Sequence, residues 1–192
     1  MTPPRAGGRA SAALACAAAC LALTACTPAG KAVGDTQTTQ PEVAHVGIQR
    51  NEARIALIGS PTAAADKPVL DAMGDTDIQT IYVSSKKSKD PDAARRQGVE
   101  DMVDRVVNLI VVSDLDVSAD ASGWDAALGS AREAGIPVAL LNPVHAPDDA
   151  TLYAATLVLN DRAADATTID DAMMTVLNDE PHEREIVVTT LR

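Results

Sequence analysis

The sequence predicts an α/β fold in which a parallel sheet is covered by helices on both faces, and three observations lead to this prediction. Six short apolar runs, rich in aliphatic and β-branched residues, recur between residues 54 and 191, as strands buried on both faces do. Helical periodicity fills most of the intervals between them. Gly, Ser, Asn or Asp follows most of the runs and ends them. Strands that alternate with helices of this length form parallel sheets.

The predicted order is β-α-β-α-β-α-β, then a loop, then a final β-α-β unit. The strand ranges are 54–59, 78–84, 106–113, 136–141, 153–159 and 185–191. The core must be aliphatic, because Phe is absent and the only aromatic residues are Trp124, Tyr82 and Tyr153. Ligands bind outside the carboxyl ends of the strands in open parallel sheets, so a site is expected at that edge.

Two of the predicted helices have clear end signals. Asp90-Pro91 supplies an N-cap and a first-turn proline for the helix before the third strand. Ser122 is predicted to cap the next helix, and Gly135 follows at the position of a C-terminal cap.

The first and last helices are less regular. The segment 64–73 is predicted as a short helix interrupted by Pro68. The last helix, 162–179, is predicted to begin at a cap supplied by Asn160 or Asp161.

The first 25 residues have the pattern of an export signal. Arg5 and Arg9 form a short basic region, and residues 10–25 are apolar and uncharged. This run is too short and too rich in Ala for a membrane span, which needs about 20 strongly apolar residues. Residues 23–26, Leu-Thr-Ala-Cys, resemble the lipobox of bacterial lipoproteins, which implies a diacylglycerol on Cys26 and cleavage before it. An ordinary secreted protein is the alternative, and the Thr-Pro after the Cys favours the lipoprotein.

Composition limits the function of the mature chain. All three Cys lie at or before the predicted cleavage point, so no thiol remains for a disulfide, a zinc site or a nucleophile. Removal of residues 1–25 leaves 14 basic against 27 acidic side chains, a charge that repels nucleic acid and anionic lipid. Residues 26–53 are polar and rich in Gly, Pro, Thr and Gln, which predicts a flexible tether between the lipid and one domain, 54–192.

The domain resembles the N-terminal part of type 1 periplasmic binding proteins, which include ribose-binding proteins and the ligand domains of LacI-type repressors. Residues 97–103, QGVEDMV, precede a strand, and residues 127–142, ALGSAREAGIPVALLN, are similar to the family's segment that leads into a strand with a ligand-binding residue at its end. Residues 153–164 resemble a later segment in which a strand ends in an Asp-Asn pair. The resemblance implies a first lobe to about residue 160 and the start of a truncated second lobe over 161–192, with incompletely packed apolar surface that would favour self-association.

The resemblance also implies that ligand contacts sit at the strand ends. The candidates are Ser60, Ser84, Asp114, Asn142, Asn160 and Asp161, with Ser85 and Ser113 beside them. Asn142 is the strongest, because it ends the central GIPVALLN strand. Ser, Asn and Asp at strand ends are also ordinary turn and N-cap residues, so at any one of these positions capping is the competing interpretation.

These features predict a membrane-anchored, extracytoplasmic solute-binding lipoprotein with a sugar-type ligand and an ABC transporter as partner. The alternative is a degenerate one-lobe relative that acts as an interaction module without a small ligand. An enzyme is not expected, because His45, His145 and His182 are isolated and no catalytic motif is present. No cofactor, metal or nucleic-acid partner is expected either.

Overall fold

The computed structural model describes residues 27–40, 46–62 and 64–192, so the predicted export signal, Cys26 and His45 lie outside the described residues. The elements in chain order are η2 (Arg50–Glu52), β1 (Arg54–Ile58), α2 (Asp66–Gly74), β2 (Gln79–Val83), α3 (Pro91–Asp104), β3 (Leu109–Ser113), α4 (Ala121–Glu133), β4 (Val138–Leu141), η3 (Ala150–Leu152), β5 (Ala155–Leu159), β6 (Thr167–Thr168), α5 (Ile169–Leu177) and β7 (Glu185–Thr189).

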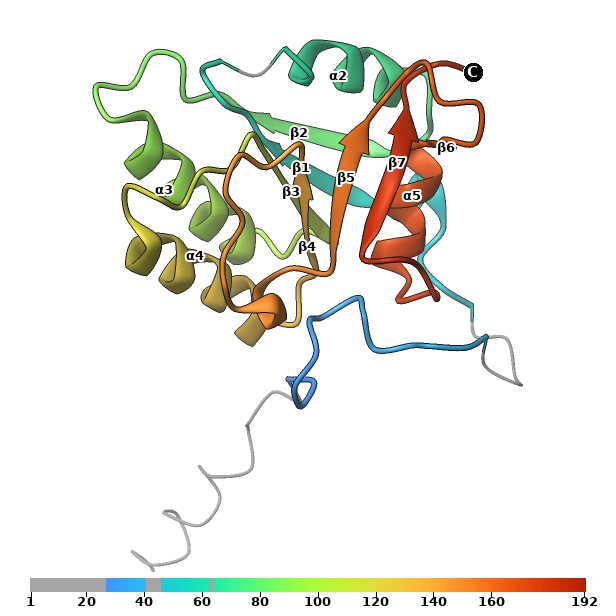
Figure 1. The fold of residues 1–192 in the computed structure, drawn as a ribbon, viewed down its shortest axis with the longest axis horizontal. Helices are drawn as coiled ribbons and strands as arrows, with labels where there is room; N and C mark the ends of the chain where they lie inside the picture. The colour runs from blue at the N-terminus through green and yellow to red at the C-terminus, as the bar shows by residue number, and fades with distance from the viewer. Residues whose placement is uncertain (1–26, 41–45, 63) are drawn as a thin grey trace, which may run out of the picture.

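Within the described residues, seven strands form one sheet in the order β2-β1-β3-β4-β5-β7-β6 (Figure 1). Every neighbouring pair is parallel. The predicted fold class is therefore confirmed, and so is the succession of the six longer strands along the chain. Only the two-residue strand β6 has no counterpart in the prediction.

The helices cover both faces of the sheet, and the side chains of each strand alternate between the two layers. In β1, Ile55 and Leu57 pack in the layer under α2 and α5, whereas Ala56 and Ile58 pack in the layer under α3 and α4. Both layers are fully buried at this strand. This explains why the strands read as continuous apolar runs rather than as alternating ones.

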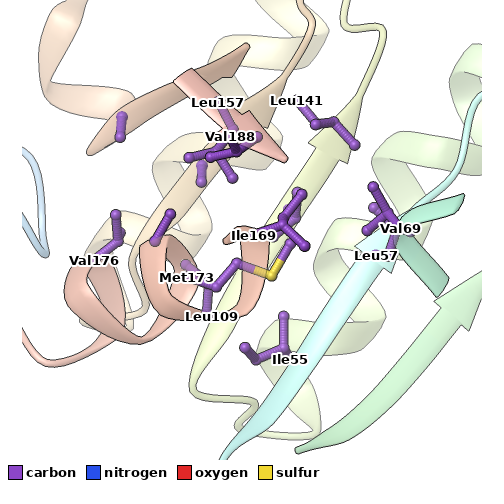
Figure 2. Packing of buried hydrophobic residues seen from close by; sticks show 14 of the residues in the cluster. Ile55, Leu57, Val69, Leu109, Leu141, Leu157, Ile169, Met173, Val176 and Val188 are labelled. Carbon is purple, nitrogen blue, oxygen red and sulfur yellow. The ribbon is translucent and has the colours of Figure 1, made fainter. Parts of the chain in front are cut away.

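Figure 2 shows the aliphatic layer under α2 and α5. Ile169, Met173 and Val176 of α5 lie against the sheet beside Leu109 and Leu157, and each is at most 1% exposed. Full burial of a side chain of this size contributes about 1.5–3 kcal/mol. The single tryptophan, Trp124, fills the opposite layer.

The end signals of two helices are mostly confirmed. Asp90 caps α3 by accepting the N–H of Ala93, with proline at the first helical position. Gly135 takes a left-handed φ of 72° directly after the end of α4. The predicted cap Ser122 was wrong, because Asp120 takes this role and accepts the N–H of Gly123 at 3.0 Å.

The predicted starts of the other two helices need correction. Pro68 does not interrupt α2, because it lies in the first turn, where the backbone N–H has no partner within the helix. The last helix does not begin at Asn160 or Asp161. It begins at Ile169, because residues 167–168 are first drawn into the sheet as β6.

Residues 161–192, assigned from the sequence to the start of a second lobe, continue the same sheet. Strand β7 pairs with β5 from Glu185 to Val188, and α5 packs onto the shared core. The expected incomplete packing is therefore wrong for α5, which is largely buried against the shared core, whereas β7 buries only Val188 and leaves its other residues exposed or half-buried.

The predicted flexible tether is also corrected where the structure describes it. Residues 27–36 lie against the domain, Ala32 belongs to the core at 2% exposure, and Ala53 is fully buried. Polar composition suggested a chain without contacts, but the backbone of this segment is held by side chains that come from distant positions, Arg132 and Asp179 among them.

Candidate functional site at the carboxyl ends of the strands

The parallel strands bring their carboxyl ends to one edge of the sheet, where the predicted site residues lie. Two of these residues adopt left-handed backbone conformations directly after their strands. Asp114 follows β3 with φ 45°, and Asn142 follows β4 with φ 46°. Such φ values are uncommon for residues other than glycine, although Asn and Asp tolerate them best. The chain therefore bends sharply directly after two adjacent strands at this edge.

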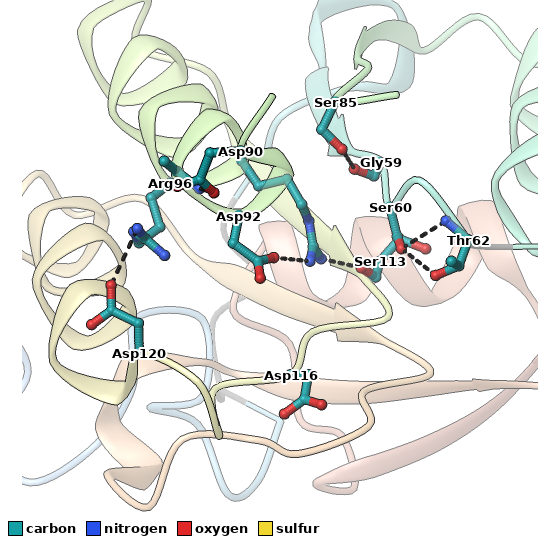
Figure 3. Close-up of polar contacts among 12 residues, drawn as sticks. Gly59, Ser60, Thr62, Ser85, Asp90, Asp92, Arg96, Ser113, Asp116 and Asp120 are labelled. Atoms are coloured by element: carbon teal, nitrogen blue, oxygen red, sulfur yellow. Dashed lines mark hydrogen bonds and ion pairs between the residues drawn. The ribbon is translucent and has the colours of Figure 1, made fainter. Parts of the chain in front are cut away.

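Ser60 and Asn142 use their side chains within the fold. The hydroxyl of Ser60 accepts the N–H of Thr62 at 3.2 Å and lies 3.0 Å from the hydroxyl of Thr62, which closes the turn after β1 (Figure 3). Asn142 Oδ1 accepts the N–H of Leu159 at 2.9 Å, so it ties the end of β4 to β5. For both residues the capping interpretation describes the contacts that the structure contains.

Asn160 and Asp161 likewise hold backbone. Asn160 Oδ1 accepts the N–H of Arg162 in a local turn. Asp161 Oδ1 accepts the N–H of Thr190 at 2.7 Å and the hydroxyl of Thr189 at 2.9 Å, so it fastens the chain after β5 to the end of β7. These bonds, led by the one from the Thr190 backbone, hold the pKa of Asp161 below its ordinary value.

The remaining candidates, Ser84 and Asp114, follow β2 and β3, which lie on either side of β1. Ser84 is exposed after β2, whereas its neighbour Ser85 is buried and donates to the carbonyl of Gly59 at 3.2 Å. Asp114 is partly buried, and its side chain makes no hydrogen bond within the described residues. Unlike Asn142, Asn160 and Asp161, Asp114 therefore keeps its side-chain oxygens unpaired within the described residues.

A buried arginine lies behind Asp114. Arg95 of α3 is 3% exposed, donates to Asp92 at 3.2 Å and also donates to the carbonyl of Ser113. Its guanidinium lies 5.2 Å from the centre of the Trp124 ring, which is within the range of a cation–π contact. Burial lowers the pKa of Arg95, and the neighbouring Asp92 opposes this shift.

A buried carboxylate completes the group. Asp66, in the first turn of α2, is 4% exposed and accepts the hydroxyl of Tyr82 at 2.9 Å. The side chains of Asp66 and Tyr82 both pack against the backbone of Gly59: a Cβ added at this position would lie 2.5 Å from the Tyr82 ring and 2.6 Å from Asp66 Oδ2. The glycine after β1 therefore allows the pair to form. We call the whole group the carboxyl-end cluster: Asp66, Tyr82, Arg95, Ser113 and Asp114.

The acidic members of the carboxyl-end cluster affect one another. Burial raises the pKa of Asp114, and the negative charge of Asp66 raises it further, while Arg95 opposes both effects. Burial and the bond to Asp66 raise the pKa of Tyr82. With Asp92, three carboxylates face one guanidinium, so the site carries excess negative charge.

Three buried polar atoms in the cluster have no hydrogen-bond partner among the residues that the structure describes: Asp66 Oδ1, Ser113 Oγ and Arg95 Nε. Such atoms are few in native proteins, and each costs about 1–3 kcal/mol when left unpaired. Together they comprise a pure acceptor, a hydroxyl that both donates and accepts, and a donor. This combination matches the hydroxyl groups of a polyol better than it matches an anion.

Sequence reasoning missed Asp66, Tyr82 and Arg95. A signal for Arg95 was present, because it lies four residues before Val99 on the apolar face of α3. A charge on a buried face needs a partner, which would have directed attention to the strand end below it.

A separate open hollow of about 500 Å³ is lined by Arg50, Asp75, Thr76, Asp77, Thr168, Asp170, Asp171 and Arg192. Its charges pair with each other: Asp170 accepts from Arg50 at 2.7 Å and from Arg192 at 3.0 Å. We favour the carboxyl-end cluster, because it gathers three of the five buried side-chain polar atoms that lack a partner within the described residues, and none of the five lies in this hollow.

Two further properties concern only the described residues. No group of three or more His, Cys, Asp or Glu side chains in this part of the chain could hold a metal ion. None of its helices combines the length and the apolar character needed to cross a bilayer. His145 lies 3.0 Å from Asp116 and His182 contacts the carbonyl of Gly34, so the two described histidines sit in separate places.

Comparisons with known proteins give partial likenesses. No protein-family model matches the chain, and no curated protein matches it. Among solved structures, a galactofuranose-binding protein is 22% identical with a TM-score of 0.44, over 57% of this chain and 36% of that one. A Mycobacterium smegmatis protein in complex with β-D-fucofuranose is 15% identical with a TM-score of 0.44, over 71% of this chain and 53% of that one. The chain thus spans about a third to a half of the length of these two proteins.

Proposed function

We propose that this chain is an extracytoplasmic solute-binding lipoprotein, held to the membrane by lipid on Cys26, that takes a sugar-type ligand at the carboxyl-end cluster. The observation that carries the proposal is the set of three buried polar atoms, from α2, α3 and β3, that have no partner within the described residues and belong to side chains beside the carboxyl ends of β1 and β3. Their location agrees with the rule that ligands of parallel sheets bind beyond the carboxyl ends.

A neutral polyol suits the chemistry of this site. Sugar hydroxyls both donate and accept, so they have the chemistry to pair with an acceptor such as Asp66 Oδ1 and with a donor such as Arg95 Nε. A phosphorylated or carboxylated ligand would meet three carboxylates against one guanidinium, and this like-charge contact would oppose binding. The ligand class proposed is therefore an uncharged sugar.

The proposed lipid anchor on Cys26 indicates which partner the protein would have. A lipid-anchored binding protein delivers its solute to a membrane transporter, so an ABC transporter is the proposed partner, in line with the resemblance of residues 54–192. A single lobe offers one wall of a site, and a second copy or a partner chain would supply the opposing wall. If no sugar binds, the one-lobe interaction module becomes the better account.

The test is a thermal melt of the protein against a panel of neutral furanoses and pyranoses, with sugar acids as comparison. A ligand at about 100 times its Kd adds ~2.7 kcal/mol of stability. For a chain of this size, that corresponds to a rise in Tm of about 5–10 °C.

Variants locate the site. Asp66→Asn and Asp114→Asn are expected to abolish the rise. Asp71→Asn is the matched control, because Asp71 is exposed and pairs with Lys67 on the outer side of α2. A cooperative melt that no sugar shifts, alone or with a candidate transporter, would count against the proposal.

A further inference from the structure

The N-terminal segment 27–36, which we call the strap, is bound along the side of the domain where the strands begin. Arg132, near the end of α4, donates to the carbonyls of Pro28 at 2.7 Å and Lys31 at 3.3 Å. Ala32 is buried in the core layer of α2 and α5. The strap therefore has both polar and apolar contacts with the folded domain.

Gly34 is the point of closest approach. It has a left-handed φ of 85°, and a Cβ here would lie 2.7 Å from the carbonyl of Val176 and 2.8 Å from Pro137 Cβ. His182 Nε2 lies 2.9 Å from the Gly34 carbonyl. Only glycine fits between the end of α5 and the start of β4, so the fit at this point is specific.

Two adjacent residues after α5, Asn178 and Asp179, bind the N-terminal part of the chain at Ile48 and at Thr36. Asp179 accepts the N–H of Thr36 at 2.8 Å and also its hydroxyl. Asn178 accepts the N–H of Ile48 at 2.8 Å and donates to the Ile48 carbonyl at 3.3 Å. Each bond joins positions more than 125 residues apart, so both contacts depend on the folded domain.

The strap and the carboxyl-end cluster lie at opposite ends of the strands: the strap at the amino ends and the cluster at the carboxyl ends. The strap contacts the ends of α4 and α5, which lead into the first residues of β4 and β7. In Figure 1 the blue strap runs below the tails of β5 and β7, whose arrowheads point the other way. A five-residue strand is about 17 Å long, so at least this distance separates the two sides.

From this arrangement we infer that the strap is an orientation device: it holds the lipid-bearing end against the amino-end side, so that the carboxyl-end cluster points away from the membrane. The inference rests on the proposed lipid at Cys26. A free tether over 26–53 would have an r.m.s. length of about 30 Å and would let the domain take any orientation. The docked strap leaves only a residue or two between Cys26 and its first anchor at Pro28.

The docking is tested by hydrogen exchange of the full chain in mild detergent. Asp179→Gly removes both bonds to Thr36 and keeps the left-handed φ of 52° at this position, so the fold is not strained. The amides of Asp35 and Thr36, which donate hydrogen bonds in the docked strap, are expected to exchange at least about tenfold faster in this variant, the factor for one charge-assisted bond. Glu180→Ala, which removes a neighbouring exposed carboxylate, is expected to leave them unchanged. Fast exchange in the unaltered protein would overturn the inference.

The orientation is tested with the lipidated chain on phosphatidylcholine vesicles that contain nitroxide-labelled headgroups. One fluorophore is placed at Glu133→Cys on the amino-end side and another at Lys86→Cys beyond β2; both sites are exposed. Quenching is expected at position 133 and not at 86, and Asp179→Gly should make the two similar. Equal quenching in the anchored, unaltered protein would refute the strap's role and leave lipid attachment standing. A chain that acquires no lipid at Cys26 would refute both.

Discussion

Replacement of Gly59 by alanine tests how the carboxyl-end cluster is built. The added Cβ would lie 2.5 Å from the Tyr82 ring and 2.6 Å from Asp66 Oδ2, far inside van der Waals contact. Tyr82 is 37% exposed and can swing outward, so its bond to Asp66 would break and leave a buried carboxylate with neither oxygen paired. We expect a loss of about 2 kcal/mol, within the ranges for overpacking and for an unpaired buried acceptor. This corresponds to a fall in Tm of about 4–8 °C.

Gly129→Ala is the matched control for this substitution. Gly129 lies inside α4 and a Cβ there meets nothing within 4 Å, so alanine should stabilise the helix by about 0.5–1 kcal/mol. A second readout is local: in a Tyr153→Phe background Tyr82 is the sole tyrosine, and Gly59→Ala should return its raised pKa toward the ordinary value. If Gly59→Ala melts like wild type, or leaves the pKa of Tyr82 raised, the proposed packing of the cluster is wrong.

Three further predictions concern neighbouring groups. Arg95→Ala should lower the free energy of unfolding in urea by about 3–5 kcal/mol, because it removes a buried, paired cation. Arg96→Ala, at a more exposed ion pair, should lower it by less than about 1 kcal/mol. Equal losses of stability in the two variants would contradict the burial of Arg95. Asn142→Ala should cost about 1–2 kcal/mol by removing the acceptor of the Leu159 N–H, and an unchanged unfolding midpoint would refute that structural role. The pKa of Asp114 is raised in the folded state, so the folded protein binds more protons just above the ordinary value of 3.8. As pH falls through this window, wild type should gain stability relative to Asp114→Asn, and parallel pH profiles would disprove the shift.

The sheet was predictable because the strands are continuous aliphatic runs and the helices between them are periodic. That the strands are parallel followed from the rule that parallel strands need crossing connections, but their order within the sheet comes from the structure alone. The short strand β6 and the late start of α5 were not predictable, because Thr167-Thr168 has no apolar signal and owes its conformation to pairing with β7. A two-residue strand is specified by its partner and not by its own sequence.

The site was predictable only in location. Residues that follow strands are visible in a sequence, but their roles depend on which atoms remain free after folding. In Asn142, the strongest candidate from the sequence, the side-chain oxygen accepts the N–H of Leu159. Asp66 sits at a helix start like an ordinary first-turn acid, and only the three-dimensional approach of Tyr82 across Gly59 shows that it is buried. The strap was missed for the same reason, since its partners lie more than 100 residues away.

Three residues with left-handed backbone provide a way to separate ligand binding from folding. Val106 follows the end of α3 with φ 53° and is exposed, so Val106→Gly should stabilise the protein by about 1–2 kcal/mol and leave sugar binding unchanged. Asn142→Gly relieves a similar strain but loses the Leu159 bond, so its effect on stability should be small or unfavourable.

Asp114→Gly gives the decisive comparison. Glycine relieves the φ of 45° and removes a carboxylate that is partly buried and repelled by Asp66, and no side-chain hydrogen bond of Asp114 is lost. The free energy of unfolding should therefore rise by about 1 kcal/mol, as at Val106, while the sugar-dependent rise in Tm disappears. A residue that lowers stability and is needed for binding is one that the fold retains for its ligand. If Asp114→Gly instead lowers stability and leaves the sugar-dependent shift intact, Asp114 serves the fold, and the ligand must bind elsewhere.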